Sequence, residues 1–316
     1  MRAYPVMLRP IPRVMPWGGK RLNGLTDAPD GVRVGEAWIL SVRDGAVSVV
    51  GGGPFEGRPL DEYLAAFPDA AGSACGGGFP LLIKLIDSAD RLSVQVHPDD
   101  EYAARVEGQR GKCEMWYVID AAPDAEIIAG LRPGVTTDMI SEGEPDESLF
   151  RKVRPVPGDV LFIPPGLVHS IGAGVLLLEI QENSDLTYRI SDFGRTFDGR
   201  KRELHLQKAA DCAVNYSNDD IEKLRFSRGG ADDPSLLCHC GAFTVKKIVS
   251  DGLSPVRLSV PDDRFTVLCA VHAEDGASLV FGDHTVPLSF GTCVFIPAGA
   301  ENVCVSGRAV SVTATV

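Results

Sequence analysis

A ten-residue pattern occurs twice in this chain, and it is the feature that most limits the possible folds. Residues 157–166 are Pro-Gly-Asp-Val-Leu-Phe-Ile-Pro-Pro-Gly, and 133 residues later residues 290–299 are Phe-Gly-Thr-Cys-Val-Phe-Ile-Pro-Ala-Gly. Each copy has a glycine turn, a short apolar run and an Ile-Pro-x-Gly turn, which predicts turn, strand and turn. The repetition predicts two similar β-rich units in one chain.

Glycine and proline also interrupt the rest of the sequence at short intervals. Its 34 Gly and 22 Pro separate short segments rich in Val, Ile, Leu and Phe, a pattern typical of a mainly β protein. Helices are expected only over Leu60–Phe67, from Pro98 to about Val106, and from Arg202 to about Val214.

The third of these helices and the polar segment after it divide the strand-rich stretches into two. We therefore predict a first domain over residues 1–204, a helix and linker over 205–234, and a second domain over 235–316.

Composition limits the partners and the location of the chain. With 31 Lys plus Arg against 43 Asp plus Glu, the net charge is −12, which disfavours binding to nucleic acid. Apolar runs such as Val175–Leu178 are far shorter than the roughly 20 residues of a membrane span, and the first residues do not resemble a secretory signal. We expect no membrane partner, a cytoplasmic location and eight reduced cysteines.

Several polar residues are spaced so that they could form one metal site. In Leu92–Asp100, strand periodicity puts Ser93, Gln95 and His97 on one face. Glu114 begins the next apolar strand, and His169 follows the Pro-Pro-Gly turn of the first repeat. If they converge, Gln95, His97, Glu114 and His169 offer two imidazoles, a carboxylate and an amide oxygen. That set suits zinc, and iron, manganese or nickel could also use it.

The sequence gives weaker support for a metal site elsewhere. The second repeat has Asn302 where the first has His169, so only the first unit is expected to carry the chemistry. Cys238-His239-Cys240 is not predicted to be a site, because adjacent residues on a strand point to opposite faces.

The repeated turn–strand–turn pattern resembles the cupins, whose small jelly-roll β barrels hold sites in their interiors. The fold implied is mainly β, with two cupin-type jelly-roll barrels and a few short helices. Blocks of sequence further resemble the short bacterial form of the type I mannose-6-phosphate isomerases. These blocks are Pro16–Gly19, Gly35–Trp38, Pro80–Lys84, Leu92–Pro98, Gly111–Tyr117, Pro157–His169, Leu178–Gln181 and Thr187–Arg195.

That resemblance implies zinc-dependent interconversion of D-mannose 6-phosphate and D-fructose 6-phosphate, with one zinc ion per chain. The implied metal ligands are Gln95, His97, Glu114 and His169, the same four as above. It also implies a catalytic role for Arg189, with Ser93 and Lys112 lining the pocket for the sugar phosphate. The oligomeric state is expected to be a monomer or a small homo-oligomer.

Aldose–ketose isomerisation moves a proton between C2 and C1 through an enediol, so it needs an electrophile for the growing negative charge and a base. Arg189 cannot act as a base at neutral pH and suits charge stabilisation or orientation of the substrate. The base should be a carboxylate, a histidine or metal-bound water near the metal. Glu182 and Asp185 are the candidate carboxylates, and the sequence does not decide among these possibilities.

Two other functions are compatible with a metal-binding cupin. One is an iron-dependent oxygenase, and the other is a non-catalytic protein that binds sugar phosphates. Neither requires Arg189 within Thr-Tyr-Arg-x-x-Asp together with Lys112 and Ser93, and this combination favours the isomerase.

Overall fold

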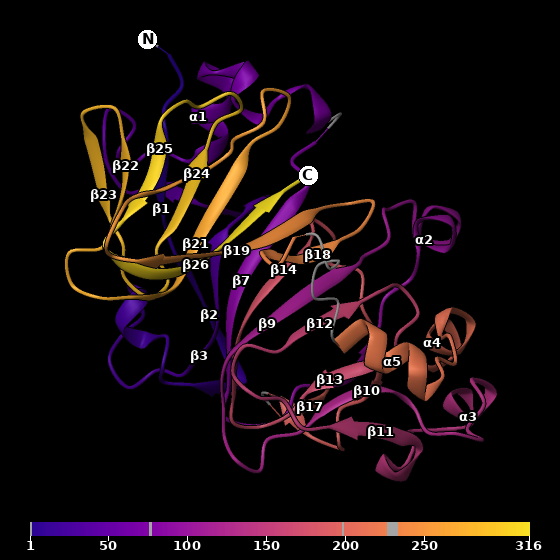
Figure 1. Cartoon of the computed structure of the whole chain (residues 1–316). Coiled ribbons are helices and arrows are strands. Elements are labelled where there is room, and N and C mark those ends of the chain that lie inside the picture. The colour runs from indigo at the N-terminus through magenta and orange to yellow at the C-terminus, as the bar shows by residue number, and fades with distance from the viewer. Residues whose placement is uncertain (1, 76–77, 198, 226–232) are drawn as a thin grey trace.

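The computed structural model describes residues 2–75, 78–197, 199–225 and 233–316. Two β-sandwich units lie side by side, as the magenta-to-orange and yellow parts of Figure 1 show. Short helices lie at the periphery of the sheets in this view. The predicted mainly β fold is confirmed.

Two sheets form the first unit. The six-stranded sheet has the order β12-β9-β14-β7-β2-β3 and the five-stranded sheet the order β11-β10-β13-β8-β15. Their bounds are β2 Ile11–Gly19, β3 Val34–Leu40, β7 Leu81–Ser88, β8 Val94–Val96, β9 Glu114–Ala121, β10 Ile127–Leu131, β11 Phe150–Val153, β12 Val160–Ile163, β13 His169–Ile171, β14 Val175–Glu182 and β15 Tyr188–Ser191.

The second unit combines a seven-stranded sheet, β18-β19-β26-β21-β24-β1-β6, with a four-stranded sheet, β20-β25-β22-β23. Their bounds are β1 Val6–Arg9, β6 Val49–Val50, β18 Leu236–His239, β19 Thr244–Asp251, β20 Val256–Arg257, β21 Thr266–Ala273, β22 Ser278–Phe281, β23 His284–Pro287, β24 Cys293–Ile296, β25 Val303–Ser306 and β26 Arg308–Thr315. Two hairpins complete the strands, β4 Val42–Arg43 with β5 Ala46–Val47, and β16 Thr196–Phe197 with β17 Arg200–Lys201.

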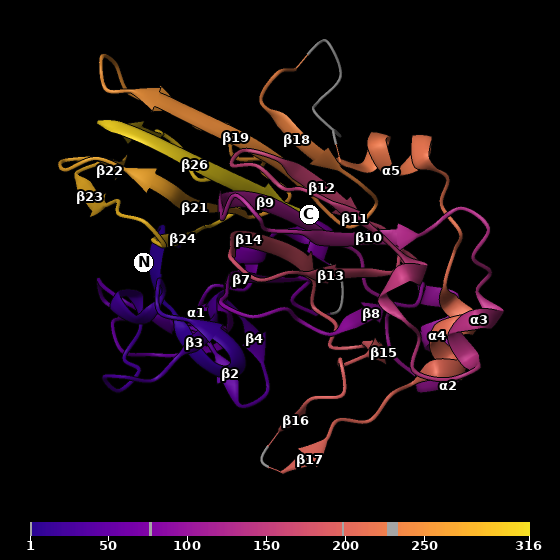
Figure 2. The same cartoon turned by 90° about the horizontal axis from the view of Figure 1, so that it is seen from below.

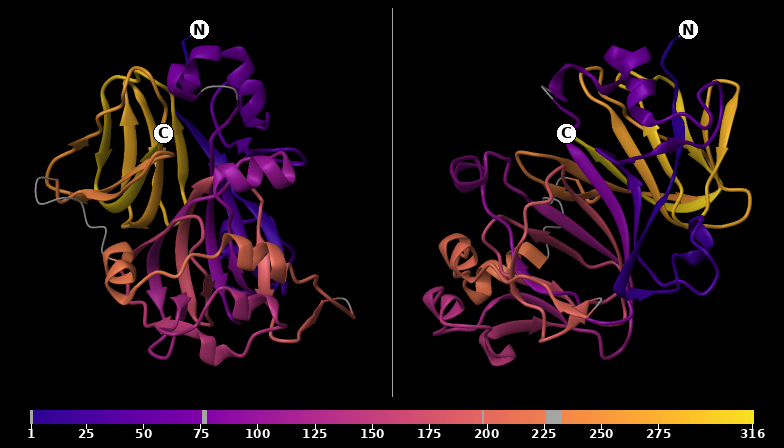
Figure 3. Two further views of the ribbon diagram at one scale, coloured as in Figure 1. Left: turned by 90° about the vertical axis from the view of Figure 1, so that its right-hand side faces the viewer. Right: turned by 180° about the vertical axis from the view of Figure 1, so that it is seen from behind.

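The N-terminal segment takes part in the second unit. Strand β1 pairs antiparallel with β24, with Met7 opposite Val294, and β6 continues that sheet beyond β1. The domain limits at residues 204 and 235 remain a prediction, but a cut there would separate β1 and β6 from the sheet they complete. Figure 3 shows the indigo N-terminal chain running along both units.

The two copies of the sequence repeat form equivalent turns and strands. Strands β12 and β24 occupy the apolar runs, and the glycines before them, Gly158 and Gly291, have φ of 91° and 83°, a region open to glycine. The copies diverge after the second turn. His169 begins β13, whereas Asn302 is an exposed loop residue with φ of 55° that accepts a hydrogen bond from Arg257.

The six-stranded and seven-stranded sheets share one large apolar core. From the central strand β7, Leu81, Ile83 and Leu85 point into this core together with Val267 and Phe295 of the second unit. Alternation along the strand turns Lys84 to the opposite face, toward the interior of the first unit. Because all residues of β7 are buried, the sequence around Lys84 is almost entirely apolar. Figure 2 shows these sheets stacked in layers.

The three predicted helices are present, with shifted ends. They are α1 Leu60–Ala66, α2 Asp100–Glu107 and α4 Leu206–Cys212. Asp99 caps α2 by accepting a hydrogen bond from the Tyr102 amide, and Gly108 ends it in a left-handed conformation. The remaining helical segments are α3 Asp138–Ser141, α5 Asn218–Arg225 and the 3-10 turns η1 Asn23–Leu25, η2 Pro68–Ala71, η3 Ser73–Cys75 and η4 Glu147–Leu149.

The polar segment after α4, predicted as part of a linker, contains a further helix, α5, in its first half. Its Ile221 is buried against the first unit and supplies the apolar contact that holds so polar a helix in place. All eight cysteines are free thiols, as expected, and the Cys113 and Cys240 sulfurs lie 3.9 Å apart. Among the described residues, the helices are too short or too polar to cross a membrane.

Candidate active site

The four predicted metal ligands come from the two sheets of the first unit. In the five-stranded sheet, Gln95 of β8 is directly opposite His169 of β13, and His97 follows β8. Glu114 is the first residue of β9 in the other sheet. The ligand atoms of His97, Glu114 and His169 all lie within 4.8 Å of one another, and the three side chains are buried.

The imidazoles are oriented toward the carboxylate. The Nδ1 atoms contact backbone carbonyls, 2.9 Å from Leu186 for His97 and 2.8 Å from Leu167 for His169. Each Nε2 then lies 3.4 Å from a different oxygen of Glu114. The amide Nε2 of Gln95 is 3.2 Å from His169 Nε2, and exchanging the two ends of that amide would present its oxygen to the same point.

Three atoms at this point suit a divalent metal ion. His97 Nε2 and both Glu114 oxygens are buried without a hydrogen-bond partner of suitable geometry within the described structure. Such orphaned atoms cost free energy unless something binds them. Burial, with Lys112, lowers the pKa of His97 to about 3, and burial also lowers the pKa of His169. Both imidazoles are therefore neutral near pH 7, as metal ligation requires.

The Lys112 ammonium lies 2.9 Å from Glu114 Oε2, at the edge of this centre. Burial alone would raise the pKa of Glu114, but Lys112 and His97 hold it well below its ordinary range. Ser93 is buried, and its hydroxyl is 3.5 Å from the Gln95 side-chain oxygen. Both residues expected at the sugar phosphate are thus beside the candidate metal ligands.

A pocket of about 280 Å³ opens next to the centre. Gln95, His169, Ser93, Lys112 and Arg189 all line it, which brings together the candidate metal, substrate and catalytic residues. His97 and Glu114 lie behind this lining. The pocket can therefore present a small polar molecule to one side of a bound metal.

An ion pair that sequence reasoning did not single out forms another wall of the pocket. Lys84 of β7 and Glu179 of β14 are directly paired across the sheet, with 2.8 Å between Nζ and Oε1. Trp116 donates its indole N–H to the other carboxylate oxygen at 3.0 Å. Burial and Glu114 raise the pKa of Glu179 against the opposing effect of Lys84. A buried carboxylate with a raised pKa suits proton transfer.

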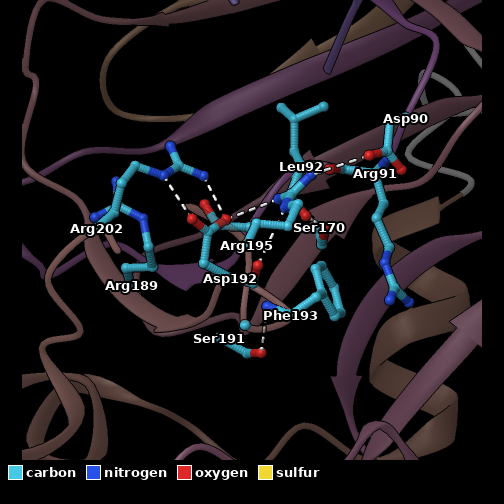
Figure 4. A network of polar contacts seen from close by, with 12 residues as sticks. Asp90, Arg91, Leu92, Ser170, Arg189, Ser191, Asp192, Phe193, Arg195 and Arg202 are labelled. Carbon is cyan, nitrogen blue, oxygen red and sulfur yellow. Dashed lines mark hydrogen bonds and ion pairs between the residues drawn. The ribbon is translucent and has the colours of Figure 1, made fainter. Parts of the chain in front are cut away.

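Arg189 lies in β15 beside Gln95 and reaches the pocket without a carboxylate partner of its own. One end of its guanidinium donates to the Glu203 carbonyl at 3.0 Å, and its buried Nε has no hydrogen-bond partner in the described structure. Asp192, which could have paired with it, instead binds Arg195 and Arg202 (Figure 4). Arg189 is therefore available to a ligand.

The two carboxylates considered as the base differ in position. Asp185 lines the pocket but is largely exposed and pairs with Arg43 at 2.6 Å. Glu182 accepts a hydrogen bond from the Cys113 amide at 2.8 Å and is not part of the lining as described.

The chain is similar along its whole length to known proteins. The family model "Phosphomannose isomerase type I, catalytic domain" matches residues 16–124. Mannose-6-phosphate isomerase ManA of Bacillus subtilis is 34% identical over 98% of both chains. A crystal structure of the mannose 6-phosphate isomerase from Bacillus subtilis superposes with a TM-score of 0.84 at 30% identity, covering 99% of this chain and 100% of that one. A zinc-bound mannose 6-phosphate isomerase structure, 15% identical over 99% of both chains, shares the fold with a TM-score of 0.76.

Proposed function

The chain belongs to the type I mannose-6-phosphate isomerase family, and we propose that it interconverts D-mannose 6-phosphate and D-fructose 6-phosphate with the help of one bound zinc ion. The observation that carries this proposal is the convergence of His97, Glu114 and His169 beside a pocket that also contains Arg189. An iron-dependent oxygenase would not need that arginine or the Lys84–Glu179 pair.

His97, Glu114, His169 and the side-chain oxygen of Gln95 would hold the metal. A metal held by these residues would supply Lewis acidity toward the oxygens of the sugar. Zinc is our choice because the donor set is nitrogen and oxygen, and because a relative of the same fold is described as zinc-bound.

The protein's own groups carry out the remaining tasks. Glu179 lines the pocket as a buried carboxylate, and we assign to it the movement of the proton between C2 and C1 in preference to the exposed Asp185. Arg189, which has no carboxylate partner in the described structure, stabilises the negative charge that grows on the sugar oxygen. Lys112 and Ser93 orient hydroxyl groups close to the metal ligands.

The test is turnover of mannose 6-phosphate by the purified zinc-loaded protein, with fructose 6-phosphate measured in a coupled assay. In D2O the recovered mannose 6-phosphate should carry deuterium at C2, because a proton-transfer mechanism exchanges that hydrogen with solvent. Oxygen uptake without isomerisation would support an oxygenase instead. Binding of the sugar phosphate without either reaction would identify a non-catalytic binding protein.

A further inference from the structure

The substrate of the proposed isomerase has two chemically different ends, a reacting end at C1 and C2 and a phosphate at C6. Lys112 is within 2.9 Å of Glu114, so it lies where C1 and C2 of the sugar must react. The phosphate is at the other end of the carbon chain. It therefore needs cationic groups on a different part of the pocket wall.

The pocket lining carries charges of both signs. Four basic side chains line it, Lys84, Lys112, Arg189 and Arg202, together with the carboxylates of Glu36, Glu179 and Asp185. The two lysines each face a carboxylate of their own, Glu179 and Glu114. The two arginines do not, because Arg202 shares Asp192 with another arginine and Arg189 donates to a backbone carbonyl.

Asp192 fixes the orientation of Arg202. The Nε and Nη2 of Arg202 donate to the two oxygens of this buried carboxylate at 2.7 and 2.5 Å, which is a bidentate pair. Within the described chain, Nη1 of Arg202 makes no hydrogen bond and is left for a ligand. Glu144 in turn accepts hydrogen bonds from the Ser191 hydroxyl and the Asp192 amide at 2.8 and 3.2 Å, which holds the segment in place.

Arg189 and Arg202 lie next to each other on one side of Asp192 (Figure 4). Burial, followed by repulsion from Arg202, lowers the pKa of Arg189, whose guanidinium still remains charged at neutral pH. Glu203 and Asp192 act in the opposite direction but do not cancel this effect. Two adjacent guanidinium groups with a surplus of positive charge favour a dianion between them.

We propose that Arg189 and Arg202 together bind the phosphate group of the hexose phosphate, and that Arg202 is a specificity-determining residue for phosphorylated sugars. This assignment rests on the proposed isomerase function for the identity of the ligand. It gives Arg202 the phosphate alone, whereas Arg189, which is paired with Gln95 of β8 and adjacent to Arg202, borders both ends of the substrate.

The matched pair of variants is Arg202→Gln and Arg195→Gln. Both remove a guanidinium that binds Asp192, but only Arg202 lines the pocket. The probe is glucitol 6-phosphate, which cannot isomerise, and its dissociation constant is measured by calorimetry on zinc-loaded protein. Unphosphorylated glucitol serves as the comparison ligand.

Loss of a charge-assisted hydrogen bond predicts a dissociation constant about 10–100-fold higher for glucitol 6-phosphate in Arg202→Gln. Arg195→Gln should change it by less than about twofold, and Arg202→Lys should recover part of the loss. In turnover, Arg202→Gln should raise KM for mannose 6-phosphate about as much while kcat and zinc content stay near wild type.

Unchanged affinity in Arg202→Gln, or an equal loss in both glutamine variants, would overturn the assignment. So would a loss in kcat with KM preserved, because that result places Arg202 at the reaction centre. Binding does not depend on turnover, so the two proposals can fail separately. Arg202-dependent binding in a wild-type protein that does not isomerise mannose 6-phosphate would refute the isomerase function and leave the phosphate site standing.

Discussion

Lys84 and Glu179 are directly opposed on neighbouring strands, and their ammonium and carboxylate groups meet 2.8 Å apart inside the first unit. Both side chains are buried on the face of the sheet that lines the pocket. Removing two charges from water costs free energy that their mutual attraction often does not recover. The stability of the fold alone therefore does not explain why this pair is buried. The pair keeps a carboxylate available in the pocket.

Removing one member of this pair should destabilise the protein strongly. Lys84→Met leaves Glu179 buried without its cation, and the expected loss is about 3–5 kcal/mol in the free energy of unfolding. The double variant Lys84→Met/Glu179→Leu should recover much of that stability and remain inactive. Urea unfolding of both variants checks this, and a single variant as stable as wild type would show that the pair is not coupled.

Replacing the proposed proton carrier should leave the metal site intact. Glu179→Gln preserves shape but cannot take up a proton, so kcat should fall about 10²–10⁴-fold with full zinc content. Exchange of the C2 hydrogen in D2O should fall by the same factor. If Asp185→Asn shows this loss and Glu179→Gln does not, the base is Asp185.

Arginine and lysine should not be interchangeable at position 189. Arg189→Lys keeps the charge but loses the planar set of donors, and the expected loss in kcat is about 10²–10³-fold, as for removal of an oxyanion donor. Zinc content should be unchanged, because Arg189 does not contact the metal ligands through its guanidinium. A near-normal rate would remove Arg189 from the mechanism.

The network around Asp192 should make stability depend on pH. Burial acts to raise the pKa of Asp192, but Arg202 and Arg195 outweigh it and lower that pKa. A carboxyl whose folded-state pKa is lowered stabilises the fold above its unfolded value, about 3.9, and loses that contribution as the pH falls through the folded value.

The free energy of unfolding of Asp192→Asn should therefore differ most from wild type between pH 5 and 7, and the difference should shrink as the pH falls below about 4. Urea titrations across this range measure it. Asp27→Asn, at an exposed position, is the control and should track wild type throughout. A difference for Asp192→Asn that does not change with pH would contradict the linkage.

The candidate metal ligands could be predicted because their signals are local. The alternation of side chains along a strand places Gln95 and His97 on one face, and the Ile-Pro-x-Gly turn predicts the strand that starts at His169. The structure brings these residues and Glu114 together as the sequence suggested.

The features missed by the sequence analysis depend on pairing between distant segments. Lys84 and Glu179 are single charges in apolar strands, a pattern that indicates buried charge, but their contact depends on the register of β7 against β14. The pairing of β1 with β24 joins opposite ends of the chain and has no local signal. Arg202 follows the hairpin strand β17, and only the fold shows that it reaches the pocket.

The most direct test of the central claim is a zinc titration of chelated protein, with metal content and mannose 6-phosphate isomerisation measured in the same samples. Wild-type protein should lose activity with its metal and regain it in proportion to zinc, reaching a plateau at one ion per chain. His169→Ala should neither retain stoichiometric zinc nor recover activity. Full isomerase activity in protein shown to be free of metal would contradict the account.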